Sequence, residues 1–152
     1  MASATDTGLI RADETLEASI RYTREDIEAF ARTSFDHNPL HRDPLAAQRS
    51  RHGRIIASGE HTAAMLMGML ATHFSRNDDG LQREMLCLNM NFSFKAPVFA
   101  DQDLRLSWHV AGVVWNSKLR GFLAHLEGGA WLDAAKPALI ARGTILVQRG
   151  SE

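Results

Sequence analysis

Cysteine is nearly absent from the sequence: Cys87 is the single one in 152 residues. One cysteine excludes an intrachain disulfide, and residues 1–11 lack the basic and apolar regions of a secretory signal peptide. We therefore expect a protein of the reducing cytoplasm. The sequence also has no apolar run of the ~20 residues that a transmembrane helix requires, so we expect no membrane partner.

An excess of charge of one sign is also missing, because 17 Lys and Arg residues stand against 18 Asp and Glu residues. Long runs of like charge do not occur, so the sequence argues against a nucleic-acid partner. We find no internal repeat and no low-complexity tract. With 45% hydrophobic residues, the chain fits a single domain over residues 1–152, in which we expect residues 1–13 to form a flexible segment.

Signals for local structure are clear in the first third of the chain. Residues 15–22 alternate between apolar and polar side chains, which predicts a half-buried strand. Thr23 follows, with Asp26 three positions later, and this capping box predicts the start of a helix that ends before Asp36. Residues 43–48 begin with Asp-Pro, a pair typical of the first positions of a short helix.

Residues 59–73 predict a longer helix that is apolar on nearly every face. Such a helix needs walls around most of its circumference. Alternating apolar residues predict four strands: residues 86–94, 104–110, 119–131 and 139–147. Short connections between them imply antiparallel neighbours. The sequence therefore predicts an α+β fold in which a curved antiparallel sheet wraps around one long central helix.

Two segments contain the side chains best suited to proton transfer. Pro39 disfavours helical geometry at the preceding residue and removes a backbone donor, so the chain can turn both Asp36 and His41 towards one cavity. An imidazole exchanges protons near neutral pH because its ordinary pKa is about 6.5. Gly59 opens the long helix, where unpaired N–H groups and the positive end of the helix dipole favour negative charge.

Each of these residues also has a purely structural interpretation. Asp-x-Asn-Pro is an ordinary turn and cap signal, and a glycine often marks a helix boundary. Four of the side chains could be metal ligands: Asp36, His37, His41 and Asp43. A clustered polar loop is commoner than a metal site, so we expect no metal.

Taken together and in this order, the two segments resemble the MaoC-like dehydratase family, which includes the (R)-specific enoyl-CoA hydratases. The family pattern is an aspartate, then Asn-Pro-Leu-His, then a helix led by glycine, and it is met here by Asp36, residues 38–41 and Gly59. Residues 94–98, Phe-Lys-Ala-Pro-Val, resemble the family's second strand and its turn. The resemblance implies the hot-dog fold and a homodimer with the substrate lying between its two subunits.

For function, the resemblance implies a lyase that needs no cofactor. Its reaction is the (R)-specific hydration of a trans-2-enoyl-CoA thioester to a 3-hydroxyacyl-CoA, or the reverse dehydration. The resemblance implies that Asp36 and His41 share the acid and base roles, and the sequence does not assign which of the two takes the proton from water. The Gly59 N–H stabilises the enolate-like oxygen. Asn38 supports the loop or positions the water.

The chain departs from the common family pattern at Phe35 and Ser58, where many members have glycine and histidine. We expect Phe35 to add a ring beside the catalytic loop, and Ser58 to offer a hydroxyl where an imidazole often stands. Two alternatives stay open. The chain could be a hot-dog thioesterase in which Glu60 activates water, or a non-catalytic acyl-CoA binding subunit with a remodelled pocket.

Overall fold

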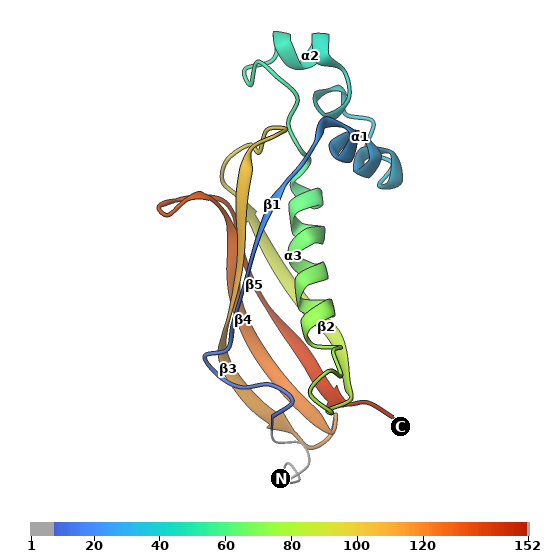
Figure 1. The fold of residues 1–152 in the computed structure, drawn as a ribbon, viewed down its shortest axis with the longest axis vertical. Coiled ribbons are helices and arrows are strands. Elements are labelled where there is room, and N and C mark those ends of the chain that lie inside the picture. The colour runs from blue at the N-terminus through green and yellow to red at the C-terminus, as the bar shows by residue number, and fades with distance from the viewer. Residues whose placement is uncertain (1–7, 152) are drawn as a thin grey trace.

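In the computed structural model, which describes residues 8–151, a curved antiparallel sheet lies against one long helix (Figure 1). In chain order the elements are β1 (Thr15–Arg21), α1 (Arg24–Thr33), a 3₁₀ helix (Pro39–His41), α2 (Pro44–Arg49), α3 (Gly59–His73), β2 (Arg83–Phe94), β3 (Asp103–Asn116), β4 (Gly121–Asp133) and β5 (Lys136–Arg149). The strand order is β1-β3-β4-β5-β2, with every neighbouring pair antiparallel. The α+β arrangement predicted from the sequence is therefore confirmed.

Local capping determines where the short helices begin. Thr23 caps α1 in the predicted capping box: its hydroxyl accepts from the Asp26 N–H, and the Asp26 carboxylate accepts from the Thr23 N–H. Asp43 caps α2, with Pro44 at the first helical position, as the sequence predicts. Both helices gather beyond the N-terminal end of α3 (Figure 1). The segment that links them therefore lies close to the start of the long helix.

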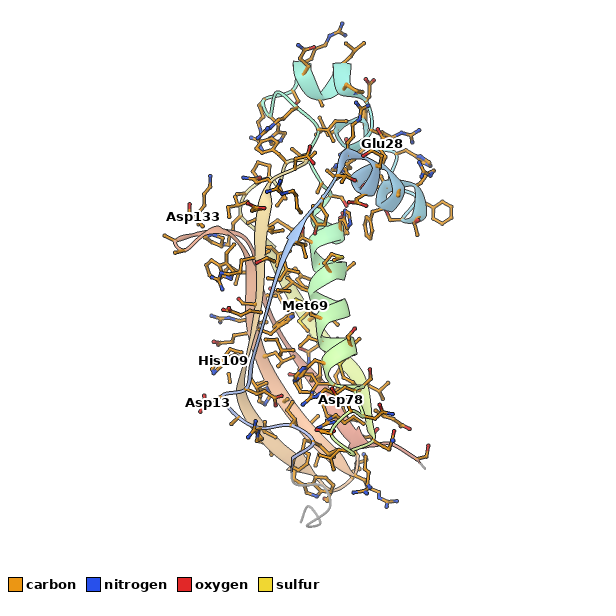
Figure 2. The ribbon with its side chains drawn as sticks, viewed as in Figure 1. Asp13, Glu28, Met69, Asp78, His109 and Asp133 are labelled. Carbon is orange, nitrogen blue, oxygen red and sulfur yellow. The ribbon has the colours of Figure 1, made fainter. Side chains whose placement is uncertain are left out.

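The hydrophobic core lies between α3 and the sheet. Leu66 and Leu70 are the fully buried residues of the helix, and the indole N–H of Trp108 on β3 donates a 2.9 Å hydrogen bond to the Leu66 carbonyl. Met67 and Met69 pack against this core (Figure 2). The buried face predicted for β3 is confirmed, because every second residue from 104 to 110 is buried.

One face of α3 remains uncovered. The exposed residues of this face are Ala64, Met65, Gly68, Ala71 and Thr72. The expectation that the remaining chain surrounds most of the helix is wrong for this side, because the five-stranded sheet covers only the other one. An apolar helix face thus stays open to solvent in the single chain.

Strand β2 forms one edge of the sheet and, within residues 8–151, pairs only with β5. A β-bulge at Leu88 interrupts this pairing and switches which side chains face inward. Leu86, Leu88 and Phe94 are 56%, 47% and 57% exposed, although the Phe94 ring lies beside Gly59 at the start of α3. The alternation read from the sequence does not bury these residues within one chain.

The N-terminal segment differs from its prediction as a flexible stretch over residues 1–13. Residues 1–7 lie outside the described residues, but Leu9 and Ile10 are buried in the core. The buried Arg83 guanidinium donates hydrogen bonds to the backbone carbonyls of Gly8 and Leu9, at 3.2 and 2.9 Å. It also binds Asp79 at 2.6 Å, and this pair lowers the pKa of the Asp79 carboxyl. The prediction is therefore wrong from Gly8 to Ile10.

Candidate active site

The C-terminal end of α1 positions the backbone of Asp36. Phe35 has a left-handed conformation, with φ of 57°. Its N–H donates to the Arg32 carbonyl at 3.3 Å, and the Asp36 N–H donates to the Ala31 carbonyl at 2.8 Å. These two bonds define a Schellman motif, the common end of a helix, in which the left-handed residue is usually glycine. The motif turns the chain sharply and ties Asp36 to α1.

Hydrogen bonds within the next turn orient the Asp36 side chain. Its Oδ1 accepts from the Asn38 N–H at 2.9 Å, while the Asn38 side chain caps the 3₁₀ helix by accepting from the Leu40 N–H at 3.1 Å. The other carboxylate oxygen, Oδ2, lies 3.4 Å from Nε2 of His41. The predicted acid and imidazole are therefore brought together, with Asn38 in the loop-supporting position.

His41 is buried, and its other ring nitrogen is held by the chain that leads into α3. Nδ1 lies 2.7 Å from the Ile56 carbonyl oxygen, and the Ile56 N–H in turn donates to the Leu40 carbonyl at 3.2 Å. A carbonyl oxygen can only accept, so Nδ1 carries the hydrogen. In the neutral ring, Nε2 therefore has the lone pair and faces Asp36.

Gly59 is the first residue of α3, so its N–H has no acceptor within the helix. The buried Ser58 is the N-cap, and its hydroxyl accepts from the His61 N–H at 3.3 Å. Ser58 thus orients the helix start, and it also lines the cavity. A β-carbon added at Gly59 would overlap the ring of Phe94. Only glycine leaves room at this point for close approach to the amide.

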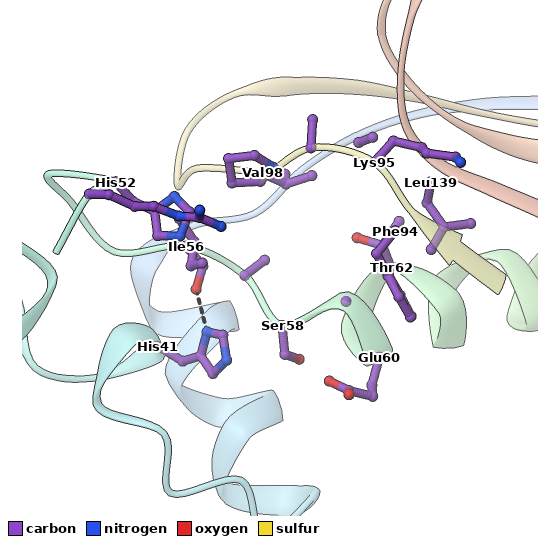
Figure 3. Close-up of a pocket in the computed structure, with 16 residues that line it drawn as sticks. His41, His52, Ile56, Ser58, Glu60, Thr62, Phe94, Lys95, Val98 and Leu139 are labelled. Atoms are coloured by element: carbon purple, nitrogen blue, oxygen red, sulfur yellow. Dashed lines mark hydrogen bonds between the residues drawn. The ribbon is translucent and has the colours of Figure 1, made fainter.

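These groups border a cavity of about 340 Å³ (Figure 3). His41, Ser58 and Gly59 line it, and Phe94 lies beside the first turn of α3. The other residues that line the cavity are Arg51, His52, Ile56, Ala57, Glu60, Thr62, Lys95, Ala96, Pro97, Val98, Ala138 and Leu139. Asp36 is not part of the lining, but its Oδ2 lies 3.4 Å from Nε2 of the lining residue His41.

The charges around the cavity are mixed. Arg51 and Lys95 are cationic side chains in its wall, and Glu60 is the acidic one. Arg54 instead stacks on Phe99, with its guanidinium carbon 4.0 Å from the ring centroid. Among residues 8–151, no group of three or more His, Cys, Asp and Glu side chains is arranged to hold a metal ion.

Comparison with known proteins identifies the family. The sequence matches the MaoC like domain over residues 8–121, which include Asp36, His41 and Gly59. The chain belongs to the MaoC-like family. The resemblance seen in its motifs is thereby confirmed.

MaoC-like relatives of known name include a hydratase and a dehydratase. The chain is 31% identical over 114 residues to the (R)-specific enoyl-CoA hydratase of Aeromonas caviae, covering 74% of this chain and 81% of the relative. It is 24% identical over 96 residues to the mitochondrial 3-hydroxyacyl-[acyl-carrier-protein] dehydratase of Arabidopsis thaliana, covering 63% of this chain and 53% of that protein. The chain thus spans about half the length of the plant relative.

The MaoC-like fold is also evident in a solved structure. The (R)-hydratase from A. caviae involved in PHA biosynthesis superposes with a TM-score of 0.76 at 23% identity, covering 93% of this chain and 98% of that chain. The predicted hot-dog fold is confirmed. Within the part of the chain that the structure describes, no helix has the length and apolar character needed to cross a membrane.

Two members of this MaoC-like site were not singled out from the sequence. Ile56 holds His41 through a backbone carbonyl, so its side-chain type contains no signal. Phe94 lies next to Gly59 although 35 positions separate them along the chain. Phe94 does fall in the segment that resembles the family's second strand, and that resemblance was the available signal.

Phe35 is a predicted site residue that the structure places away from the cavity. Its side chain is 84% exposed in the single chain and is absent from the cavity lining. Glycine adopts the left-handed conformation of this position without strain, which is a physical reason for the glycine of the common family pattern.

Replacing Phe35 by glycine should therefore stabilise the fold. We expect Phe35→Gly to raise the free energy of unfolding by about 1 kcal/mol, because a β-carbon is disfavoured in the left-handed region and the exposed ring has few contacts to lose. Urea denaturation measures the change. Phe35→Ala is the matched control, since it removes the ring but keeps the β-carbon. Equal stability of the two variants would show that backbone strain is not the cause.

Proposed function

We propose that this MaoC-like protein adds water to a trans-2-enoyl thioester to form an (R)-3-hydroxyacyl thioester, or catalyses the reverse dehydration. The observation that carries the proposal is the cavity shared by His41 and the first amide of α3, with the Asp36 carboxylate 3.4 Å from the imidazole. Hydration needs a base for water, an acid for Cα and a donor for the enolate-like oxygen. The site offers one group for each need.

The Asp36–His41 pair supplies the proton-transfer groups. Oδ2 of Asp36 and the lone pair on Nε2 of His41 are both acceptors, and they face each other across 3.4 Å. A water molecule seated against both would donate one hydrogen to each, which leaves its oxygen lone pairs directed at the substrate. The pair then takes a proton from this water as the oxygen bonds to Cβ, and returns a proton to Cα.

Gly59 supplies the oxyanion donor. Negative charge develops on the thioester oxygen while Cα awaits its proton. The Gly59 N–H has no intrahelical acceptor and stands at the positive end of the α3 dipole. A preorganised donor of this kind stabilises a transition state by about 3 kcal/mol. Ser58, by capping the same turn, keeps this amide pointed out of the helix.

The carrier we propose is CoA. Arg51 and Lys95 give one part of the cavity wall a positive charge, which suits the phosphate groups of a CoA thioester. The named relatives reported above are a hydratase and a dehydratase, and neither supports the thioesterase hypothesis based on Glu60.

A thioester panel tests the reaction directly. Crotonyl-CoA and longer or branched enoyl-CoA esters are incubated with the purified protein, and loss of the enoyl thioester is followed by absorbance. A thiol reagent reports free CoA in parallel samples. We expect hydration without thiol release, and a 3-hydroxyacyl product of R configuration. Thiol release at the rate of enoyl loss would instead identify a thioesterase, and binding without turnover across the panel would identify a non-catalytic subunit.

We also propose that the protein acts as a homodimer. The open face of α3 and the free edge of β2 together expose apolar side chains that include Met65, Leu86 and Leu88. Gly68 lies within the helix face, and apart from its own stretch of helix no atom of residues 8–151 lies within 4 Å of where its β-carbon would be. A second copy would cover both surfaces, and also the exposed Phe94 ring at the cavity.

Charge placed on the open helix face should therefore separate the subunits. We expect wild-type protein to sediment as a dimer at micromolar concentration and Gly68→Glu to sediment as a monomer, because a buried carboxylate without a partner is costly. Ala134→Glu is the matched control, since Ala134 is an exposed residue of the β4–β5 hairpin, away from α3. A monomeric wild type, or a dimeric Gly68→Glu protein, would contradict the proposed interface.

A further inference from the structure

His61 has an environment that the proposed chemistry does not use. The residue is 7% exposed, and its ring stacks between Tyr22, at a centroid distance of 4.1 Å, and Phe30, at 4.4 Å. Its Nδ1 has no hydrogen-bond partner among residues 8–151. Every other buried side-chain nitrogen or oxygen atom of the described residues has one. His61 is also absent from the cavity lining. The ring is therefore almost entirely buried and lies outside the cavity lining.

The stack joins the two elements that position the site. Phe30 belongs to α1, whose end holds Asp36 through the Ala31 carbonyl. His61 lies two residues after Gly59 in the first turn of α3. The Tyr22 hydroxyl adds a 3.0 Å hydrogen bond to the Thr62 hydroxyl in the same turn. One imidazole thus lies where the helix that supports the acid meets the turn that supplies the amide donor.

Packing alone does not require a histidine at this position. Phenylalanine would offer the same two stacking faces without a buried nitrogen that lacks a partner. The groups that face the ring from the β1–α1 segment are Tyr22, which is neutral because burial raises its pKa to about 12, and Asp26. Burial lowers the pKa of His61 and outweighs the opposing effect of the Asp26 charge. The imidazole is therefore neutral at neutral pH.

We propose that His61 is a positioning residue: in its neutral form it clamps the first turn of α3 to α1 and so holds the Gly59 amide against the Asp36–His41 pair. Protonation releases the clamp, because the added charge is buried and the Nδ1–H finds no acceptor among the described residues. The inference rests on the proposed hydration for its catalytic consequence. The clamp itself is a property of the fold.

Kinetics of two variants test the catalytic consequence. His61→Ala removes the stack and should lower kcat at least tenfold with less than a threefold change in KM. His61→Phe keeps the stack and should retain kcat within threefold at neutral pH, with activity that persists to lower pH than in the wild type. A folded His61→Ala protein with wild-type kcat would overturn the positioning role. If kcat falls at the same acidic pH in the wild type and in His61→Phe, release of the clamp by protonation is wrong.

Hydrogen exchange and unfolding test the clamp without any substrate. His61→Ala should speed exchange of the Thr62 and Ala63 amides at least tenfold, while His61→Phe should not. As the pH falls below about 6.5, unfolded His61 binds a proton before the folded residue does, so wild-type stability should fall relative to His61→Phe. The clamp would be refuted if the Thr62 and Ala63 amides of His61→Ala exchanged at the wild-type rate. It would also be refuted if the stabilities of the wild type and His61→Phe changed in parallel with pH. Absence of hydration by the wild type would refute the proposed function and leave these results standing.

Discussion

Replacing His41 by glutamine is expected to lower kcat for enoyl-CoA hydration about 10³-fold, the scale of losing a proton-transfer group. The imidazole is buried, and its Nε2 is the ring nitrogen that faces Asp36. Glutamine keeps a polar side chain of similar reach but cannot exchange a proton near neutral pH. Steady-state kinetics with crotonyl-CoA measure the loss. KM should change little, because the binding surface of the cavity is otherwise retained.

Asp36→Asn should produce a loss of similar size. The amide oxygen can still accept from the Asn38 N–H, so the loop keeps its shape while the carboxylate charge is lost. His37→Gln is the matched control, since His37 is an exposed imidazole of the same loop that contacts Arg42 at 3.0 Å. The assignment of the pair is wrong if His41→Gln or Asp36→Asn retains wild-type kcat, or if His37→Gln loses as much as they do.

Gly59→Ala is expected to reduce kcat/KM about 10²-fold, because a displacement of about 1 Å at a reacting group can cost that much. The new methyl group would overlap the Phe94 ring, so either the ring shifts into the cavity or the first turn of α3 moves. The backbone N–H is still present. The effect therefore measures how closely the thioester must approach this amide.

A control and a double variant separate the causes of that loss. Gly112→Ala adds the same methyl group on β3, where no described residue other than its chain neighbours lies within 4 Å, and should leave activity unchanged. Phe94→Ala combined with Gly59→Ala relieves the overlap within the chain. Partial recovery in the double variant would assign the loss to the displaced ring, and no recovery would assign it to the blocked amide. Wild-type kcat/KM in Gly59→Ala alone would contradict the role of Gly59.

Sequence patterns predicted the features of this protein that depend on neighbouring residues. The capping box of Thr23 and Asp26, the Asp43-Pro44 start of α2 and the full extent of α3 are all local, and each is confirmed. The Asp36–His41 contact was also predicted, because Pro39 forces a turn between the two residues. The hot-dog fold came from the family resemblance carried by the same motifs.

Local sequence patterns did not predict the features that depend on distant contacts or on backbone conformation. Glycine is the usual sequence signal of a Schellman motif, and this chain has phenylalanine at position 35 instead. The bulge at Leu88 reverses the inward face of β2, although the apolar alternation continues through it. The hydrogen bond from His41 to the Ile56 carbonyl joins positions 15 residues apart through an atom that every residue has. The Leu9 carbonyl accepts a hydrogen bond from Arg83 at the start of β2, 74 positions further along the chain.

A crystal structure with butyryl-CoA, a saturated thioester that cannot be hydrated, tests the central claim most directly. The account predicts that the thioester oxygen accepts a hydrogen bond of about 3 Å from the Gly59 N–H. Cβ should then face the space between Nε2 of His41 and Oδ2 of Asp36. A thioester oxygen bound elsewhere, with its acyl chain directed away from His41, would contradict the proposed hydration.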